Sequence, residues 1–212
     1  MYKIIKWILD RLLSLLAGIV FFPFFLIIGL VIKLTSKGPI LFKQTRVGKN
    51  KKLFKIWKFR TMRVDTPKDC PTHLLSDPDQ YITKIGKFLR KTSLDELPQI
   101  YNILFGKMSI IGPRPALWNQ YDLIEERDKY GANNVYPGLT GWAQINGRDE
   151  LEIEVKAKLD GEYIEKFGFI IDCKCFFGTI KSVLKSDGVV EGGTGALNRN
   201  EMQEKRKISK VD

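Results

Sequence analysis

The most pronounced pattern along the chain is an uncharged hydrophobic run near its N-terminus. Twenty-one residues, LLSLLAGIVFFPFFLIIGLVI from Leu12 to Ile32, contain no Asp, Glu, Lys or Arg. A helix of that length rises about 31 Å, which matches a bilayer hydrocarbon core of about 30 Å. Pro23 stands at its centre, lacks an N–H and clashes with the carbonyl of Ile19, so the helix is predicted to bend there. Each half, about eleven residues, then reaches only to mid-bilayer.

Basic residues flank this run on both sides. Lys3, Lys6 and Arg11 precede it, and a basic segment from Lys33 onward follows it. Basic flanks favour the cytoplasmic side of a membrane, and a straight spanning helix cannot place both flanks there. We therefore expect residues 1–36 to form a proline-kinked, re-entrant membrane helix. An ordinary spanning helix with a tolerated proline is the alternative.

Shorter periodicities follow the membrane segment. ILFKQTRV and KLFKIWKF surround the turn sequence GKNK, which predicts a basic β-hairpin from Ile40 to Phe59. Apolar spacing of three and four residues predicts further helices at Tyr81–Lys91, Glu96–Leu104, Ala116–Tyr130, Glu152–Phe167 and Phe169–Lys185. The glycine-rich stretch Tyr136–Arg148 is predicted to be a loop.

These elements predict an α+β fold, a small and mostly helical domain that carries the hairpin and the N-terminal membrane helix. We expect a domain at residues 37–186 and a flexible tail at 187–212, where no apolar period continues. The last helix places Ile170, Cys173, Phe177, Ile180 and Leu184 on one face. That face indicates either core packing or an interfacial helix that touches lipid.

The charge balance narrows the class of partner. Thirty-five Lys and Arg against twenty-four Asp and Glu leave a formal charge of +11. The eleven basic residues from Lys33 to Arg63 are accompanied by no acidic one, which predicts an anionic partner at this segment. The single histidine, His73, argues against histidine-based triads and His-rich zinc sites, so the chemistry is expected to rest on carboxylates and cations.

Two adjacent carboxylates stand out in RKTSLDELPQIYN. Asp95 and Glu96 follow Ser93 in a pattern that matches the capping box S-x-x-E, so both acids are explained by helix capping alone. Pro98 argues against that register, because it falls inside the helix that Ser93 would cap. With Asp95 as the N-cap, Pro98 lies in the first turn, and the carboxylate sits where phosphate also binds well.

A second candidate is Arg114 in IGPRP. Prolines on either side fix the backbone, so the guanidinium is presented from a stiff segment that suits bidentate contact with a phosphate. A structural ion pair explains an isolated arginine equally well.

Three blocks together resemble a known family. LFKIWKFRTM, TSLDELPQIYNILFGKMSIIGPRPAL and YPGLTGWAQINGR are similar to the signature blocks of the bacterial sugar transferases, monotopic phosphoglycosyl transferases that start glycan assembly. The likeness runs from about Arg11 to Lys185. It implies transfer of a sugar 1-phosphate from a UDP-sugar to polyprenyl (undecaprenyl) phosphate, with release of UMP and initiation of capsule, polysaccharide or glycoprotein glycan synthesis.

The resemblance also implies roles for residues. Asp95 is the expected nucleophile, forming an aspartyl-phosphosugar intermediate, and Glu96 completes a dyad that holds Mg²⁺. The cations expected to bind phosphate are Arg90, Arg114, Arg148, Lys58 and Arg60. Asp160 is a further candidate acid, although a surface helix acid explains it as well.

The resemblance implies a bacterial inner or plasma membrane protein with its catalytic domain on the cytoplasmic face. Membrane lipid, UDP-sugar and polyprenyl phosphate are the expected partners, and nucleic acid is not. Likeness to capsule-type initiators implies an N-acetylated, 6-deoxy hexose, and a homo-oligomer is left open. The competing interpretation is a membrane-tethered basic adaptor that binds acidic lipid or nucleic acid, with Asp95 and Glu96 as helix caps only.

Overall fold

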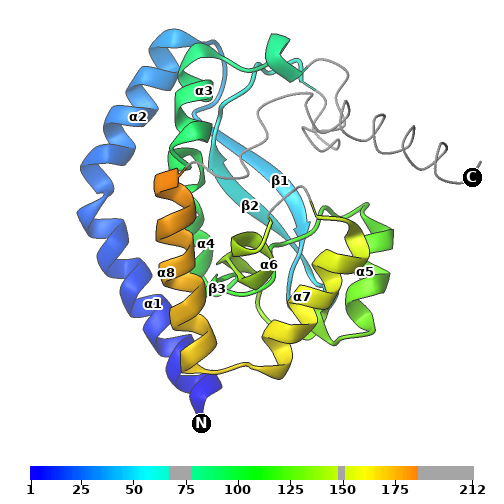
Figure 1. Cartoon of the computed structure of the whole chain (residues 1–212). Helices are drawn as coiled ribbons and strands as arrows, with labels where there is room; N and C mark the ends of the chain where they lie inside the picture. The colour runs from blue at the N-terminus through cyan, green and yellow to red at the C-terminus, as the bar shows by residue number, and fades with distance from the viewer. Residues whose placement is uncertain (67–77, 148–150, 186–212) are drawn as a thin grey trace, which may run out of the picture.

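A computed structural model describes residues 1–66, 78–147 and 151–185. The chain begins with two helices, α1 (Tyr2–Val20) and α2 (Phe22–Thr35), which together form a long bow along one side of the molecule (Figure 1). The helices meet at Phe21 at an angle of 60°. Pro23 lies in the first turn of α2, where its missing N–H costs no helical hydrogen bond.

The face that α1 turns toward the domain is polar and small. Lys6, Asp10, Ser14 and Gly18 are buried at four-residue spacing, whereas the leucines and isoleucines around them are exposed. Gly18 faces α4, because a Cβ placed there would lie 3.9 Å from side-chain atoms of Ile100 and Tyr101. α1 therefore buries its polar face and exposes its apolar face, which is the reverse of an amphipathic helix in a soluble protein.

The basic hairpin is confirmed. β1 (Leu41–Val47) pairs antiparallel with β2 (Leu53–Phe59), and Leu41 faces Phe59 in the register. Between them lies the 3₁₀ turn η1 (Lys49–Lys51). Phe54 and Ile56 of β2 enter a buried cluster with Ile103 and Met108, which fixes β2 against α4.

The remaining elements are short. α3 (Lys84–Lys91) follows the 3₁₀ turn η3 (Pro78–Gln80), and the turn η4 (Leu94–Glu96) leads into α4 (Gln99–Leu104). β3 (Ser109–Ile111) pairs in parallel with β4 (Gly138–Thr140), a second small sheet that the periodicity does not predict. Beyond β3 lie α5 (Tyr121–Asp128) and the turn η5 (Ala132–Asn134), and beyond β4 lie α6 (Trp142–Ile145), α7 (Ile153–Glu165) and α8 (Phe169–Lys185).

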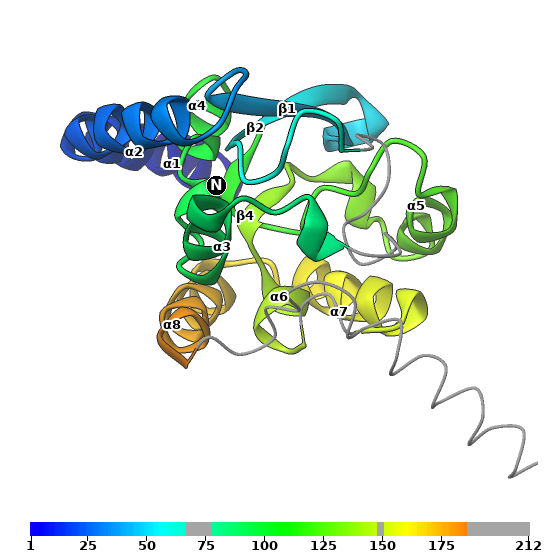
Figure 2. The same ribbon diagram turned by 90° about the horizontal axis from the view of Figure 1, so that it is seen from above.

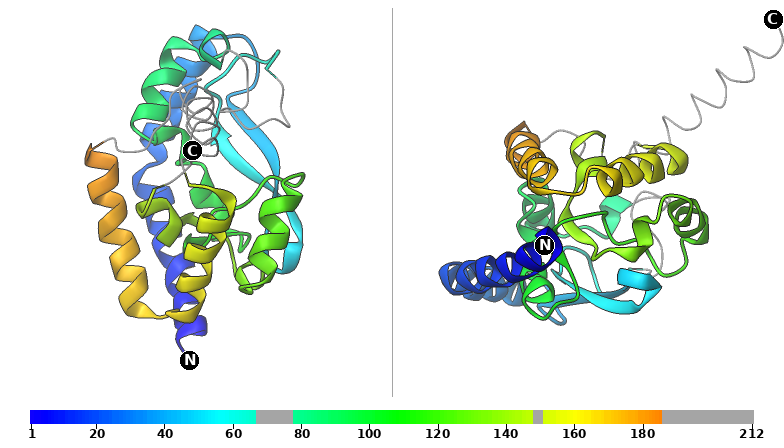
Figure 3. Two further views of the ribbon diagram at one scale, coloured as in Figure 1. Left: turned by 45° about the vertical axis from the view of Figure 1, so that its right-hand side comes forward. Right: turned by 90° about the horizontal axis from the view of Figure 1, so that it is seen from below.

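The elements surround the small parallel sheet. Seen from above, the hairpin lies on one side of the domain and α7 and α8 lie on the other, and α6 lies between α7 and α8 (Figure 2). α8 begins beside the N-terminus of α1 (Figure 3), where Asp172 accepts hydrogen bonds from Tyr2 and Tyr163 and pairs with Lys6 at 2.9 Å. At its other end the helix pair is anchored by Ile32 of α2, which packs with Phe59 and Leu89. The mixed helix and sheet fold is as predicted.

Three expectations need correction. The stretch predicted as a loop contains β4 and α6, and the helix predicted at Ala116–Tyr130 begins only at Tyr121, because Gln120 accepts a hydrogen bond from the Leu117 N–H and closes a turn there. In α8, Ile170, Phe177 and Ile180 are exposed, so the interpretation of that face as core packing is wrong. The predicted tail at 187–212 is not one of these corrections, because it lies outside the described residues and stays a prediction.

Candidate active site

The dyad lies in a tight turn rather than at a helix cap. Ser93 has a φ of 56°, in the left-handed region, and makes no side-chain capping bond. The chain therefore turns sharply before Leu94, Asp95 and Glu96, which form η4, and Pro98 directly precedes α4. The capping box on Ser93 and the N-cap role of Asp95 are both wrong, because the left-handed residue closes a separate turn before the helix begins.

Glu96 is held by two cations. Lys58 Nζ donates a hydrogen bond to Glu96 Oε1 at 2.7 Å, and Arg114 donates from Nη2 to the same oxygen at 2.6 Å and from Nη1 to Oε2 at 3.2 Å. Burial opposes ionisation of Glu96, but the attraction of Arg114 and Lys58 outweighs it and lowers the pKa. Glu96 is therefore a permanent carboxylate that joins the hairpin to the PRP segment.

Asp95 lies in a different environment from its neighbour. It is 8% exposed, and its carboxyl group makes no hydrogen bond within the described residues. Burial raises the pKa of Asp95 to about 6, a shift that the charge of Glu96 increases and that Lys58, Arg90 and Arg114 oppose. Near pH 7 it is ionised but weakly solvated, a state that suits a nucleophile.

The three other predicted cations are Arg90, Arg60 and Arg148. Arg90 of α3 donates from Nε to Thr61 Oγ1 at 3.0 Å and contributes positive charge to the surroundings of Asp95. Arg60 is directed elsewhere, because its Nη2 donates to the carbonyl and hydroxyl of Ser36 at the end of α2. Arg148 lies outside the described residues. The structure thus brings Lys58, Arg90 and Arg114 to the dyad and places Arg60 at the C-terminal end of α2.

Arg114 is fixed from behind by a buried ion pair. Asp160 of α7 is 1% exposed and pairs with Arg127 of α5, Nε to Oδ2 at 2.8 Å and Nη2 to Oδ2 at 2.6 Å. Arg127 Nη1 also donates to the backbone carbonyl of Arg114 at 2.9 Å. Asp160 is therefore no surface acid. It positions Arg127, which in turn orients the segment that carries Arg114.

The sequence argument missed Arg127. It lies thirteen residues after Arg114, outside the three signature blocks, and one arginine in a charged helix has no distinguishing pattern. One observation could have indicated it. Arg127 lies on the same side of a short helix as the apolar Leu123, which suggests that it is buried. A buried arginine needs an acidic partner on a neighbouring element.

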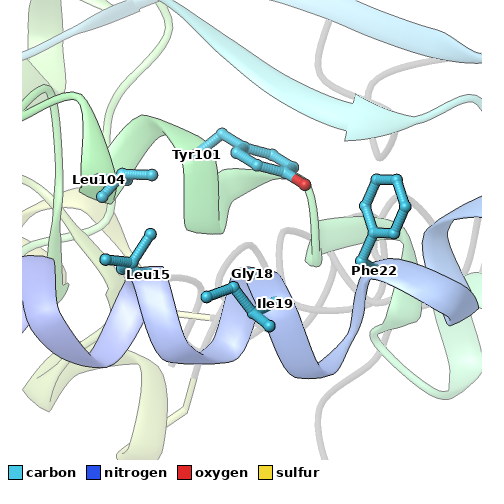
Figure 4. Close-up of a pocket in the computed structure, with 6 residues that line it drawn as sticks. All are labelled: Leu15, Gly18, Ile19, Phe22, Tyr101 and Leu104. Atoms are coloured by element: carbon cyan, nitrogen blue, oxygen red, sulfur yellow. The ribbon is translucent and has the colours of Figure 1, made fainter.

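An apolar cavity lies on the side of α4 that faces α1. Its volume is about 340 Å³, and its wall consists of the side chains shown in Figure 4: Leu15, Gly18, Ile19, Phe22, Tyr101 and Leu104. Tyr101 is six residues beyond Asp95 along the chain, so α4 connects this cavity to the turn that carries the dyad.

Comparison with known proteins decides the family. The family model described as bacterial sugar transferase matches residues 1–186. The chain belongs to the bacterial sugar transferase family. It is 42% identical over 159 residues to the uncharacterized sugar transferase EpsL of Bacillus subtilis, covering 75% of this chain and 77% of that protein.

Two further relatives of this sugar transferase are named by function. The UDP-glucose:undecaprenyl-phosphate glucose-1-phosphate transferase of Escherichia coli is 42% identical over 186 residues, with 84% of this chain and 40% of the relative covered. The exopolysaccharide production protein PSS of Rhizobium leguminosarum is 39% identical over 193 residues, which cover 85% of this chain and 96% of that protein. The chain thus spans about two fifths of the length of the Escherichia coli relative.

In this sugar transferase the dyad offers one available carboxylate for a metal ion. No group of three or more His, Cys, Asp or Glu side chains suited to a metal occurs in the described ranges. Both Glu96 oxygens accept hydrogen bonds from cations, whereas the Asp95 carboxylate has no such partner among these residues. Mg²⁺ commonly binds through one or two carboxylates and substrate phosphates, so the donor set fits such an ion at Asp95.

Proposed function

We propose that this chain transfers a sugar 1-phosphate from a UDP-sugar to polyprenyl phosphate, releasing UMP. The observation that carries the proposal is the unequal dyad: one carboxylate is buried with no hydrogen-bond partner in the described chain, beside one that is bound by Lys58 and Arg114. An N-acetylated, 6-deoxy hexose is the proposed sugar. Initiation of capsule or another polysaccharide is the proposed pathway step.

The reaction has two steps at one phosphorus atom. An Asp95 oxygen attacks the sugar-linked phosphorus of the UDP-sugar, the bond from that phosphorus to the bridging oxygen breaks, and UMP leaves with the electron pair. An oxygen of the lipid phosphate then attacks the same phosphorus and the Asp95 carboxylate is released. No proton transfer to Asp95 is needed, because the carboxylate enters and leaves ionised and the lipid phosphate, with a second pKa near 6, is mostly dianionic at pH 7.

The surrounding cations reduce the repulsion between these anions. Arg90 of α3 and Arg114 of the segment after β3 both lie near the dyad, and a guanidinium has donors suited to phosphate oxygens. Asp95 would hold Mg²⁺, and the ion would supply further neutralisation of the diphosphate. Glu96 holds Lys58 and Arg114 in place, so its removal would disorganise the cations rather than remove the nucleophile.

The helix pair supports the proposed membrane placement. No single described helix is both long and apolar enough to span a bilayer, but α1 and α2 meet the criterion as a bent pair. Together with the exposed apolar face of α1, this supports a re-entrant segment, and the basic residues on both flanks favour the cytoplasmic face for the domain. The apolar cavity between α1 and α4 offers a place for part of the polyprenyl chain (Figure 4).

The decisive experiment measures UMP release. Purified full-length chain is given a panel of UDP-sugars with polyprenyl phosphate and Mg²⁺. Asp95→Asn should lower the rate by at least about 10³-fold, since it removes the attacking group, whereas the matched control Asp122→Asn, an exposed acid of α5, should leave it unchanged. Release that survives Asp95→Asn unchanged, or no release with any sugar, would favour the membrane-tethered adaptor.

The topology has its own test. In a chain whose native cysteines are replaced, single cysteines at Lys3 and Lys37 are treated with a membrane-impermeant thiol reagent in intact cells and after lysis. A re-entrant segment protects both positions in intact cells. Labelling of one position only, from outside, would instead establish a spanning helix.

A further inference from the structure

A second cavity lies at the N-terminal end of α1. Its volume is about 330 Å³, and its wall combines α1 residues with Lys49 of the hairpin turn, the segment at Tyr136 and Phe167 after α7. Lys49 lies in the turn before β2, and Lys58, the hairpin contact of the dyad, is near the other end of β2. Leu53 to Lys58 alone spans about 17 Å of strand, so this cavity is separate from the dyad.

Three cations of this cavity are held against aromatic rings. Arg11 lies 3.8 Å from the centroid of the Trp7 ring, Lys49 lies 4.7 Å from that of Tyr136, and Lys3 lies 6.0 Å from that of Phe167. None of the three has a carboxylate within ion-pair distance among the described residues. Stacking on a ring fixes a cation in position but leaves its charge uncompensated.

The other charged groups at the cavity pair with one another. Lys6 pairs with Asp172 at 2.9 Å and with Asp10 at 3.7 Å, and Asp10 also accepts a hydrogen bond from Ser109. Lys6 with these two carboxylates leaves one negative charge, which the three ring-stacked cations Lys3, Arg11 and Lys49 exceed, so the net formal charge around the cavity is +2. Such an arrangement attracts an anion.

Arg11 also has hydrogen-bonding capacity to spare. Its Nη1 donates to the Trp7 carbonyl at 2.8 Å, whereas Nη2 is buried and has no partner in the described part of the chain. A buried guanidinium nitrogen without an acceptor is costly. An anionic oxygen at this position would remove that cost.

The surroundings identify the anion. Ile4, which lines the cavity, and Ile8 beside it are exposed on the face of α1 that we place in the membrane. A ligand there contacts cations and hydrocarbon at once, as a phospholipid does at the head-group level. We propose that this cavity binds the phosphodiester head group of an anionic phospholipid and fixes the N-terminal end of the re-entrant segment.

The inference rests on the membrane placement under the proposed function but not on the chemistry of Asp95. Its test uses full-length chain in nanodiscs of phosphatidylcholine, with or without phosphatidylglycerol that carries a photoreactive group. Cross-linked peptides are mapped by mass spectrometry. UMP release from a UDP-sugar is measured on the same samples, so loss of lipid binding is distinguished from failure of the catalytic proposal.

The variant Arg11→Gln/Lys49→Gln removes two cavity charges. Its matched control, Lys33→Gln/Lys37→Gln, removes two charges at the other end of the helix pair. Each basic residue near an anionic surface contributes about a factor of five, so cross-linking at the cavity should fall roughly thirtyfold in the first variant and stay near wild type in the control. Lys49→Gln alone, on a half-exposed turn, should give a roughly fivefold loss and covers the case in which Arg11→Gln fails to fold.

Three results would overturn the proposal. One is equal loss of cavity cross-linking in both double variants, which would show attraction to the whole basic surface. Another is cross-linking at this cavity that survives Lys49→Gln and the double variant. The third is complete displacement of the lipid by millimolar inorganic phosphate, which would identify a site for free phosphate.

Discussion

The helix α1 and the strand β2 bury opposite kinds of side chain. In β2 the buried side chains include Phe54 and Ile56, and Lys55 between them is exposed. In α1 the buried side chains include Lys6, Asp10 and Ser14, and the leucines are exposed. Each element buries the side chains that its surroundings do not solvate, so the difference fits water around the hairpin and, in the proposed placement, hydrocarbon around α1.

The largest expected effect is a loss of stability when a buried ion pair in the core of the domain is broken. Asp160→Asn leaves Arg127, which is 3% exposed, as a buried charge without its partner. Breaking such a pair costs about 3 to 5 kcal/mol. Asp128→Asn, the control, breaks a pair with Lys51 in which both side chains are about half exposed and should cost less than about 1 kcal/mol.

Thermal or denaturant unfolding of both variants checks this expectation. UMP release by folded Asp160→Asn adds a second readout, since Arg127 also holds the Arg114 carbonyl and its displacement should lower kcat. Equal stabilities of the two variants would show that the core of the domain does not depend on the buried pair.

A leucine in each region gives the next test. Leu16 of α1 is 59% exposed and Leu53 of β2 is 60% exposed, so exposure alone does not separate them. Aspartate at the centre of a membrane helix costs about 2.5 to 3.5 kcal/mol, whereas a surface change in water is usually within about 0.5 kcal/mol. Leu16→Asp should move the protein out of the membrane fraction and Leu53→Asp should not. Identical partition of the two variants would remove the distinction between the regions.

Two glycines test how closely α1 and α3 pack against their neighbours. A Cβ at Gly86 of α3 would lie 2.0 Å from the Thr61 carbonyl oxygen, whereas one at Gly18 of α1 meets side chains at 3.9 Å. Gly86→Ala should therefore destabilise by about 1 to 3 kcal/mol. Gly18→Ala should be neutral or stabilise by up to about 1 kcal/mol, because it improves helix propensity without a clash. Unfolding midpoints of both variants decide, and the reverse order would refute the packing described here.

The smallest effect separates the chemistry of the domain from its membrane attachment. Because the attacking Asp95 must be ionised and its pKa lies at about 6, the burst of UMP release without lipid acceptor should fall about tenfold for each pH unit below that value. Omission of the acceptor excludes titration of the lipid phosphate. Leu16→Asp in detergent should give the same pH profile. A profile flat from pH 7 to pH 5 would contradict the role of Asp95.

Local patterns predicted the parts of the fold that local interactions build. The hairpin follows from alternation and its turn, and α8 from an apolar period that begins at Phe169 and ends at Lys185 as expected. β3 and β4 have three residues each and pair across 26 intervening residues, so no local pattern marks them. Which face of α8 is buried was also undetermined, because Ile171 and Cys175 share the helix with equally apolar exposed residues.

The site shows the same division. Local patterns singled out Asp95, Glu96 and Arg114, family resemblance gave them their roles, and the structure gathers them with Lys58 and Arg90. The left-handed Ser93 was not predictable, since serine seldom adopts that conformation and the S-x-x-E pattern favours a cap. Arg60 shares a block with Lys58, but the end of the strand directs its guanidinium to α2.

The 60° bend at Phe21 fixes a shape with consequences for the bilayer itself. Helices of 19 and 14 residues are about 28 Å and 21 Å long. In the proposed re-entrant placement, legs that meet the surface at equal angles would each slope by about 30°, descending about 14 Å and 11 Å while extending about 42 Å along it. The pair is then a shallow wedge that displaces lipid in one leaflet only. A wedge of that kind expands the leaflet on its own side and therefore favours a membrane that is convex toward the domain.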